Sequence, residues 1–281
     1  MYPAKVLLFG EHTVLRGGRG LAVPYTRRGL RWVRDRPDEA LLAFCDYLRV
    51  AFADRGLLNT DALEDFLAND WRLAGDIPVG YGLGSSGAVC AAIWDRFATP
   101  RGKFLTGEDL RQALARMEQH FHGSSSGTDP LVCYLGRPVM LGEGAPRPAT
   151  LPPDWNDRFF LVDTGTERKA ARLIQNFTSR YDADAGFALA VDTHWREPAD
   201  RAIAALLGGK PTEVTLQTSV ISEFQHSELP DFIPPRFHGR WSGEHYVLKL
   251  CGAGGGGMLL GLRLGEDRNA VEQVFGRVEW L

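Results

Sequence analysis

Gly82-Leu83-Gly84-Ser85-Ser86-Gly87 is followed by small and apolar residues that predict a helix over residues 85–97. Glycines permit positive φ and let a backbone approach a bulky anion, so that successive N–H groups converge on it. A helix that begins here adds unpaired N–H groups and the positive end of its dipole. The segment therefore predicts a phosphate-binding loop. The alternative is an ordinary glycine turn with a serine N-cap.

This loop is not of the Walker type, because Gly-Lys-Ser and Gly-Lys-Thr do not occur in the chain. Its two serine hydroxyls can nevertheless bond phosphate oxygens or bind Mg²⁺, as the hydroxyl of a Walker loop does. The loop alone does not decide between a phosphate site and a capped turn. The rest of the sequence has to decide it.

A second motif begins in a helix predicted from residue 107 to about 121, with Thr106-Gly107-Glu108-Asp109 as its capping box. Glu118 lies near the end of this helix, where the dipole disfavours a carboxylate, so a cation partner or plain solvation is expected. Asp129 follows eleven residues later, before an apolar run at 131–135 that predicts a strand. A carboxylate at the mouth of a strand suits a general base, and a turn-forming Asp is the alternative.

The third motif is Lys249-Leu250-Cys251-Gly252-Ala253-Gly254-Gly255-Gly256-Gly257, in which a glycine-rich run begins at Gly252. Apolar strands are predicted on both sides of it, at 246–250 and 258–262. A flexible linker would have polar flanks. We therefore expect close packing of this backbone against a ligand or another backbone.

The remaining periodicity predicts a mixture of strands and helices without strict alternation, which favours an α+β architecture. Residues 142–157 are rich in Gly and Pro and are the best candidate linker, which predicts one domain at 1–150 and a second at 151–281. Strands are predicted at 6–9, 21–23, 138–141 and 159–162, and helices at 38–55, 61–68, 168–180, 184–193, 199–207 and 266–275.

Composition narrows the function classes. The 281 residues carry a net charge of −3 and show no basic stripe, which argues against a nucleic-acid binder. The longest apolar runs are too short for a membrane span, and the N-terminus lacks the pattern of a signal peptide. Four cysteines are scattered singly, so buried, reduced thiols and a cytoplasmic location are expected.

Together and in this order, the three motifs resemble those of the GHMP kinases. Ala4-Lys5-Val6-Leu7-Leu8-Phe9-Gly10-Glu11-His12-Thr13-Val14 resembles that family's first motif in the form of its mevalonate kinase branch. Galactokinases typically carry Asp-Tyr where this chain has Val14-Leu15. The resemblance implies a two-domain α+β fold, with a ribosomal S5 domain 2-like N-terminal domain and a ferredoxin-like C-terminal domain. It also implies an ATP-dependent kinase acting on a small-molecule alcohol, most closely mevalonate, which would become 5-phosphomevalonate.

The resemblance also implies roles for individual residues. Asp129 resembles the catalytic aspartate, which would accept or orient the hydroxyl proton, and Lys5 resembles the lysine beside it. Ser86 and Glu118 resemble the Mg²⁺ ligands. The segment Gly82, Leu83, Gly84, Ser85, Ser86 and Gly87 resembles the loop around the ATP phosphates, and the substrate contacts would come from Glu11, His12, Gly252, Ala253 and Gly254. His12 would bond a hydroxyl or a carboxylate.

This chain departs from the family pattern at four positions. The usual Pro in the second motif is Ser125, the common Asn after the aspartate is Pro130, a frequent Ala is Gly87, and a frequent Thr is Cys251. None of these changes removes a reacting group, so kinase chemistry is still expected. They do loosen the assignment of the substrate.

The substrate and the partners stay open at this point. Arg168 or Lys169 would pair with an acidic substrate or would simply be solvated. Other GHMP kinases act on a sugar, homoserine or phosphomevalonate, and a sister decarboxylase is disfavoured by the pattern of Lys5 and Glu118. A nucleotide sensor without turnover would have degraded catalytic positions. A homodimer is possible by resemblance, whereas nucleic-acid and membrane partners are not expected.

Overall fold

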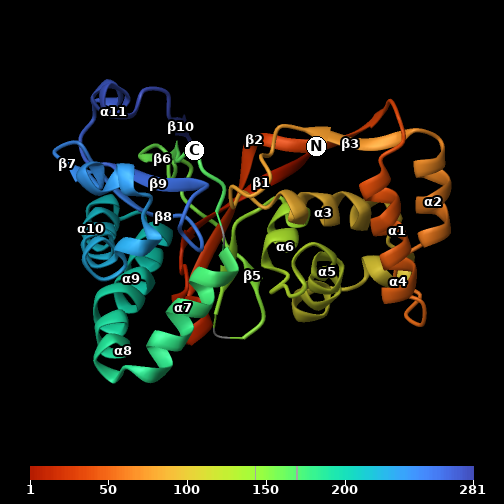
Figure 1. Cartoon of the computed structure of the whole chain (residues 1–281), viewed down its shortest axis with the longest axis horizontal. Coiled ribbons are helices and arrows are strands. Elements are labelled where there is room, and N and C mark those ends of the chain that lie inside the picture. Colours follow the sequence, from red (N-terminus) through yellow and green to blue (C-terminus); the bar gives the residue numbers. More distant parts are fainter. Residues whose placement is uncertain (143, 169) are drawn as a thin grey trace.

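Two five-stranded sheets form the framework of the computed structural model, which describes residues 1–142, 144–168 and 170–281 (Figure 1). All the strand pairs are antiparallel. The first sheet has the order β1-β2-β4-β5, with β3 also paired to β2, and the second has the order β10-β6-β9-β8-β7. The strands are β1 (Tyr2–Phe9), β2 (Gly20–Arg34), β3 (Trp71–Gly75), β4 (Val139–Leu141), β5 (Arg147–Pro148), β6 (Phe159–Asp163), β7 (Ser242–Gly243), β8 (Tyr246–Leu250), β9 (Met258–Arg263) and β10 (Glu279–Trp280).

The helices lie at both ends of the molecule, with the long strands β1 and β2 between them (Figure 1). They are α1 (Glu39–Ala51), α2 (Thr60–Ala68), α3 (Ser85–Phe97), α4 (Pro100–Lys103), α5 (Gly107–His122), α6 (Thr128–Leu135), α7 (Ala170–Ala183), α8 (Ala185–Val191), α9 (Glu197–Leu207), α10 (Pro211–Glu228) and α11 (Arg268–Phe275). A π-helical turn, Asp192–Arg196, joins α8 to α9. No helix within the described ranges has the length and apolar character needed to cross a bilayer.

Strand β1 lies at the centre of the molecule. Helices α3 and α6 pack on it, and α9 from the second half of the chain contacts both β1 and β2. Most of its side chains are buried, which explains its compact apolar sequence, and Lys5 is buried among them with 4% of its surface exposed. A buried lysine needs a partner. Strand β1 therefore carries a charge into the middle of the fold.

Apart from the short edge strand β7, the second half follows the order β-α-β-β-α-β, with helices α7 to α10 between β6 and β8 and with α11 between β9 and β10. This is the ferredoxin-like arrangement that the family resemblance implies. The glycine run 252–257 is the loop of the hairpin between β8 and β9, in which Leu250 pairs with Leu259. The predicted α+β class is confirmed.

The predicted strand at 131–135 is wrong, because these residues belong to helix α6. Gly127 adopts the left-handed conformation as N-cap, with φ of 73°. Pro130 lies in the first turn, where its missing N–H would have no helical partner in any case. A short apolar run does not distinguish a buried strand from a buried helix. Asp129 therefore lies at a helix N-terminus, which is also favourable for a carboxylate.

Other expectations need correction too. Thr106 is the N-cap of α5, but its side chain makes no capping hydrogen bond to the described residues, so the capping box does not form. The expected linker contains strand β5, which pairs with β4. Strand β3 and the long helix α10 were not predicted. All four cysteines are buried free thiols, as expected.

Candidate active site

Asp129 and Lys5 form an ion pair, with 2.9 Å between Oδ2 and Nζ. The Asp129 side chain is 27% exposed, so a small molecule can reach it, whereas the Lys5 side chain is 5% exposed. Lys5 Nζ also donates to the carbonyl of Gly82 at 3.4 Å. The structure thus brings the two predicted catalytic residues together and places the first glycine of the predicted phosphate loop beside them.

The predicted phosphate loop leads directly into α3. Gly82 and Gly84 have φ values of 78° and 73°, which favour glycine. Gly84 is the N-cap of α3, so the alternative of a serine N-cap is wrong. The backbone N–H of Lys5 donates to the carbonyl of Leu83 at 2.8 Å and ties the loop to β1. Ser85 and Ser86 form the first turn of the helix, where free N–H groups attract anions.

Gly87 allows the N-termini of α3 and α6 to meet. A Cβ at this position would lie 2.7 Å from the carbonyl carbon of Asp129 and 2.8 Å from the nitrogen of Pro130. Neither atom can move away without moving the backbone of α6. Two departures from the family pattern, Gly87 and Pro130, are therefore in direct contact. The positive ends of both helix dipoles converge next to Asp129.

Glu118 is 5% exposed and is close enough to this pair to interact electrostatically with both Asp129 and Lys5. Ser86 Oγ donates to Oε1 of Glu118 at 2.9 Å, and Ser125 Oγ donates to Oε2. His122 Nε2 lies 3.1 Å from Ser86 Oγ and donates to it, because the serine proton is directed to Glu118. Burial raises the pKa of Glu118 to about 7, and the Asp129 carboxylate adds to this rise.

This environment fits a divalent cation. The carboxylates of Glu118 and Asp129 share the positive charge of Lys5, so a further cation is favourable here. A hydroxyl and a carboxylate are oxygen ligands of the kind that Mg²⁺ prefers. Within the described part of the chain, no three His, Cys, Asp or Glu side chains gather into a metal-binding group. Mg²⁺ is commonly held by one or two carboxylates together with substrate phosphates. Ser86 and Glu118 match such a site, in which the protein supplies only some of the metal ligands.

His12 is enclosed rather than exposed, with 5% of its surface accessible. Its ring packs against Phe177, Trp195 and Phe232. Nε2 lies 3.1 Å from the carbonyl of Ala253 and must donate to it, so Nδ1 carries the lone pair. Nδ1 is buried and has no hydrogen-bond partner among the described residues. The structure therefore brings His12 to the third glycine motif.

Glu11 is buried as well, and it pairs with Lys249 at the end of strand β8. Lys249 is fully buried and also donates to the carbonyls of Leu8 and Leu250, at 2.9 and 2.8 Å. Burial lowers the pKa of Lys249 to about 7, and the electrostatic interaction with Cys251 opposes that change. Oε2 of Glu11 has no partner among the described residues. The predicted substrate contact by Glu11 stays a prediction, since one of its oxygens is already occupied.

The third glycine motif packs closely against other chain segments, as its sequence predicts. A Cβ at Gly254 would lie 2.9 Å from the carbonyl oxygen of Phe232, and one at Gly252 would lie 2.5 Å from Nη1 of Arg168. A Cβ at Gly82 would meet the same Nη1 at 2.4 Å. The Arg168 guanidinium therefore lies between the first and third glycine loops. Lys169, the alternative cation, lies outside the described residues.

Sequence reasoning gave no role to three residues of this neighbourhood. Ser125 contacts Glu118, His122 contacts Ser86, and Lys249 pairs with Glu11. It also did not predict that Arg168 lies between the two glycine loops. Ser125 was noticed as a departure from the family pattern without a role, and Arg168 was considered as a partner of an acidic substrate or as a solvated side chain. Lys249 is in the third motif, and a lysine in an otherwise apolar strand was the available signal. His122 had no such signal.

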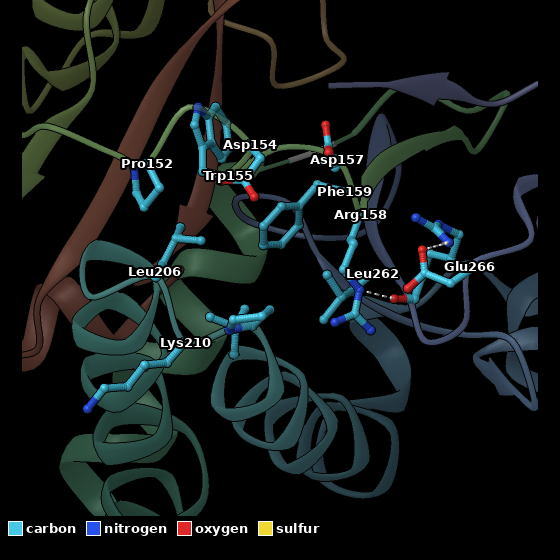
Figure 2. A pocket seen from close by; sticks show the side chains of 14 residues that line it. Pro152, Asp154, Trp155, Asp157, Arg158, Phe159, Leu206, Lys210, Leu262 and Glu266 are labelled. Atoms are coloured by element: carbon cyan, nitrogen blue, oxygen red, sulfur yellow. Dashed lines mark hydrogen bonds and ion pairs between the residues drawn. The ribbon is translucent and has the colours of Figure 1, made fainter.

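A separate cavity of about 260 Å³ lies in the second half of the chain (Figure 2). Trp155 and Phe159 form part of its wall, and Lys210 points away from it. Arg158 Nε donates to the carbonyl of Arg263 at 2.9 Å, and Nη1 of Arg263 lies 3.6 Å from Glu266. Its lining contains none of the predicted site residues. This cavity is therefore not part of the candidate site.

The chain is similar to known kinases in sequence and in fold. The family model described as GHMP kinases N terminal domain matches residues 51–137. A mevalonate kinase of Pyrococcus horikoshii is 25% identical over 305 residues, which cover 97% of this chain and 90% of that protein. The solved structure of L. major mevalonate kinase in complex with R-mevalonate has a TM-score of 0.67 at 18% identity, and the match covers 99% of this chain and 93% of that one.

Residues 51–137 match the N-terminal domain of the GHMP kinases, and the fold of the whole chain is similar to that of solved mevalonate kinases. Both matches agree with the resemblance that the three ordered motifs carry. A mevalonate kinase of Thermococcus gammatolerans is 28% identical over 169 residues, 50% of this chain. In that alignment the chain spans about half of the relative's length, 51%. The GHMP kinase fold is thus established for this chain, whereas the roles of its individual site residues stay predictions.

Proposed function

We propose that this GHMP kinase transfers the γ-phosphate of ATP to a hydroxyl group of mevalonate and releases 5-phosphomevalonate and ADP. The observation that carries the proposal is the Lys5–Asp129 ion pair, which lies where the N-termini of α3 and α6 converge. Phosphoryl transfer needs positioning and charge stabilisation more than covalent chemistry. The curated relatives named as mevalonate kinases support the choice of acceptor.

In this mechanism the substrate oxygen forms a bond to the γ-phosphorus while the bond from that phosphorus to the β–γ bridging oxygen breaks. Asp129 accepts or orients the hydroxyl proton, and Lys5 holds Asp129 in place. The loop 82–87 and the first turn of α3 would hold the phosphates of ATP. Ser86 and Glu118 would hold Mg²⁺, which when bound supplies charge neutralisation for the transferred group.

The acceptor side of the site suits a hydroxy acid. His12 Nδ1 carries a lone pair, so it accepts a hydrogen bond from a hydroxyl and would repel a carboxylate. The Arg168 guanidinium between the glycine loops matches a carboxylate. A reacting hydroxyl at Asp129, a second hydroxyl at His12 and a carboxylate at Arg168 together describe mevalonate. Arg168 would also suit a phosphate, which keeps phosphomevalonate as the second candidate.

Mg²⁺ dependence, a cytoplasmic location and a homodimer belong to the proposal as well. Four buried free thiols are consistent with a reducing compartment. The domain division at residue 150 is also proposed, with the catalytic pair in the first part and the third glycine motif in the second. Each of these points can be examined in the purified protein.

The deciding experiment is a coupled ADP-release assay with mevalonate, phosphomevalonate, galactose and homoserine. Mevalonate is expected to be turned over selectively, and selective turnover of another alcohol would refute the acceptor assignment. Asp129→Ala should lower kcat by about a hundredfold or more, because a positioned proton acceptor is lost. ATP binding should remain, as measured by calorimetry.

The matched control for this substitution is Asp182→Ala, which removes a surface carboxylate paired with Arg16. It is expected to retain full turnover. A fully active Asp129→Ala enzyme would show that the proton acceptor lies elsewhere.

A further inference from the structure

Lys249 occupies a position that is unusual for a lysine. It is fully buried on strand β8, and its ammonium group uses all three donors, on Glu11 and on the carbonyls of Leu8 and Leu250. The Phe9 ring lies 5.5 Å away. Three protons thus meet three acceptors. This arrangement leaves Lys249 no free donor for a substrate.

The pair connects two distant motifs. Glu11 lies two residues after the end of β1, a strand of the first sheet, whereas Lys249 lies on β8 in the second sheet, just before the glycine run 252–257. A buried ion pair is a poor source of stability, because desolvation cancels much of the attraction and apolar residues often serve as well. The stability of the fold therefore does not explain a charged pair here. A requirement for one defined geometry in this region explains the charged pair.

The turn that follows Glu11 needs such a geometry. His12 has φ of 56°, a conformation that costs free energy for a residue with a side chain. It persists because its surroundings hold it, through the bond from Nε2 to the Ala253 carbonyl and through the fixed neighbour Glu11. Nδ1 then remains as an acceptor without a partner among the described residues.

We propose that Lys249 is a positioning residue for the alcohol substrate. By holding Glu11, it fixes the turn at residues 10–13 against the third glycine motif and so presents Nδ1 of His12. Glu11 then acts through the protein rather than by touching the substrate. This inference rests on the proposed function, and it changes the role that the family resemblance implies for Glu11.

The kinetic test compares Lys249→Met, Glu11→Gln and the double variant. Each single variant leaves a buried polar group unpaired and should be less stable than the wild type. The double variant removes both charges and should recover thermal stability, yet its KM for the alcohol should stay raised by about tenfold. The KM for ATP should change little, because the loop 82–87 is not touched.

The matched control is Glu279→Gln. Glu279 also joins the two sheets, through Arg28 and Tyr25, but it lies outside the three sequence motifs. It should lower the melting temperature and leave both KM values unchanged. If the double variant has the wild-type KM for the alcohol, the pair is merely structural and the proposal is refuted.

A second measurement does not depend on turnover. In ¹⁵N-histidine-labelled wild-type protein, His12 should show the neutral tautomer protonated at Nε2, with its signal assigned by the His12→Gln variant. The double variant should lose this signature, because the turn is released. An unchanged signal would overturn the positioning role even if the enzyme used no tested alcohol. Absence of turnover by the wild type together with a lost signal would refute only the proposed function.

Discussion

His12 is a neutral imidazole held among aromatic rings. Burial lowers its pKa to about 4, and the charge of Arg168 adds to this effect, whereas the Ala253 carbonyl opposes it. From the family resemblance, His12 was expected to form a hydrogen bond with a hydroxyl or a carboxylate of the substrate. Only its surroundings show which nitrogen is free and that the ring stays uncharged at neutral pH. The sequence therefore indicated that His12 is a candidate site residue, but it did not indicate the protonation state of its ring.

This pKa predicts a loss of stability in acid. An unfolded histidine binds a proton near pH 6.5, so between pH 6.5 and about 4 the unfolded chain binds more protons than the folded one. His12 should therefore cost stability progressively as pH falls through this window, by up to about 3 kcal/mol. Urea unfolding at pH 7 and at pH 4.5 measures this loss.

The His12→Gln variant should show a smaller difference between the two pH values, since glutamine does not titrate. His245→Gln is the control, because His245 is exposed and should leave the difference unchanged. Equal differences in the wild type and in His12→Gln would contradict the assignment.

Helices α3 and α6 show what a single glycine does at the scale of an element. Their N-termini approach each other at Gly87, and this approach brings Asp129 next to the phosphate loop. The sequence predicted the bounds of α3 correctly, because its small residues directly follow the loop. It did not predict α6, since the run 131–135 contains too few residues to show a helical period.

Gly87→Ala is expected to push α6 away from α3, because its Cβ would meet backbone atoms of Asp129 and Pro130. The expected cost is about 1–3 kcal/mol of stability. We also expect a fall in kcat of about tenfold, because Asp129 moves from its aligned position. Thermal unfolding and the ADP-release assay measure the two effects. Gly239→Ala is the control, since a Cβ there meets no described atom within 4 Å. Wild-type values of both quantities for Gly87→Ala would contradict the packing argument.

Helix α10 was missed for a different physical reason. Its buried residues include Gln217, Thr218, Ser222 and Gln225 beside apolar ones, so no apolar stripe marks a face. Some of these polar groups find partners inside the fold, as when Oε1 of Gln225 accepts from the backbone of Leu250 at 2.8 Å. A helix packed on both α9 and β8 does not need the pattern of a surface helix.

At the scale of the whole molecule, the two sheets share one hydrophobic cluster. It contains Val6 and Phe9 of the first sheet together with Phe159 and Leu260 of the second. The rings of Phe9 and Phe159 lie 6.3 Å apart, edge to face. A second cluster lies within the first half, among α1, α2, α3 and α5. The division at residue 150 therefore crosses a packed core.

We expect the protein to unfold in a single cooperative thermal transition, because separating the halves would expose this shared cluster. Calorimetry measures this directly, as equality of the calorimetric and van't Hoff enthalpies. A residue 1–150 fragment should unfold less cooperatively than the full chain. Two separate transitions in the full chain would contradict this expectation and would support independent domains.

The sequence by itself determined the three motifs, their order and the α+β class, because glycine loops and hydrophobic periods are local properties of the chain. The ordered motifs also carry the resemblance to the GHMP kinases. Only the tertiary structure decided that Asp129 begins a helix, that Ser125 binds Glu118 and that Lys249 neutralises Glu11. Such pairings join residues that are distant in sequence, and burial sets their charges. A linear pattern specifies neither the distance between two side chains nor the solvent that they lose on folding.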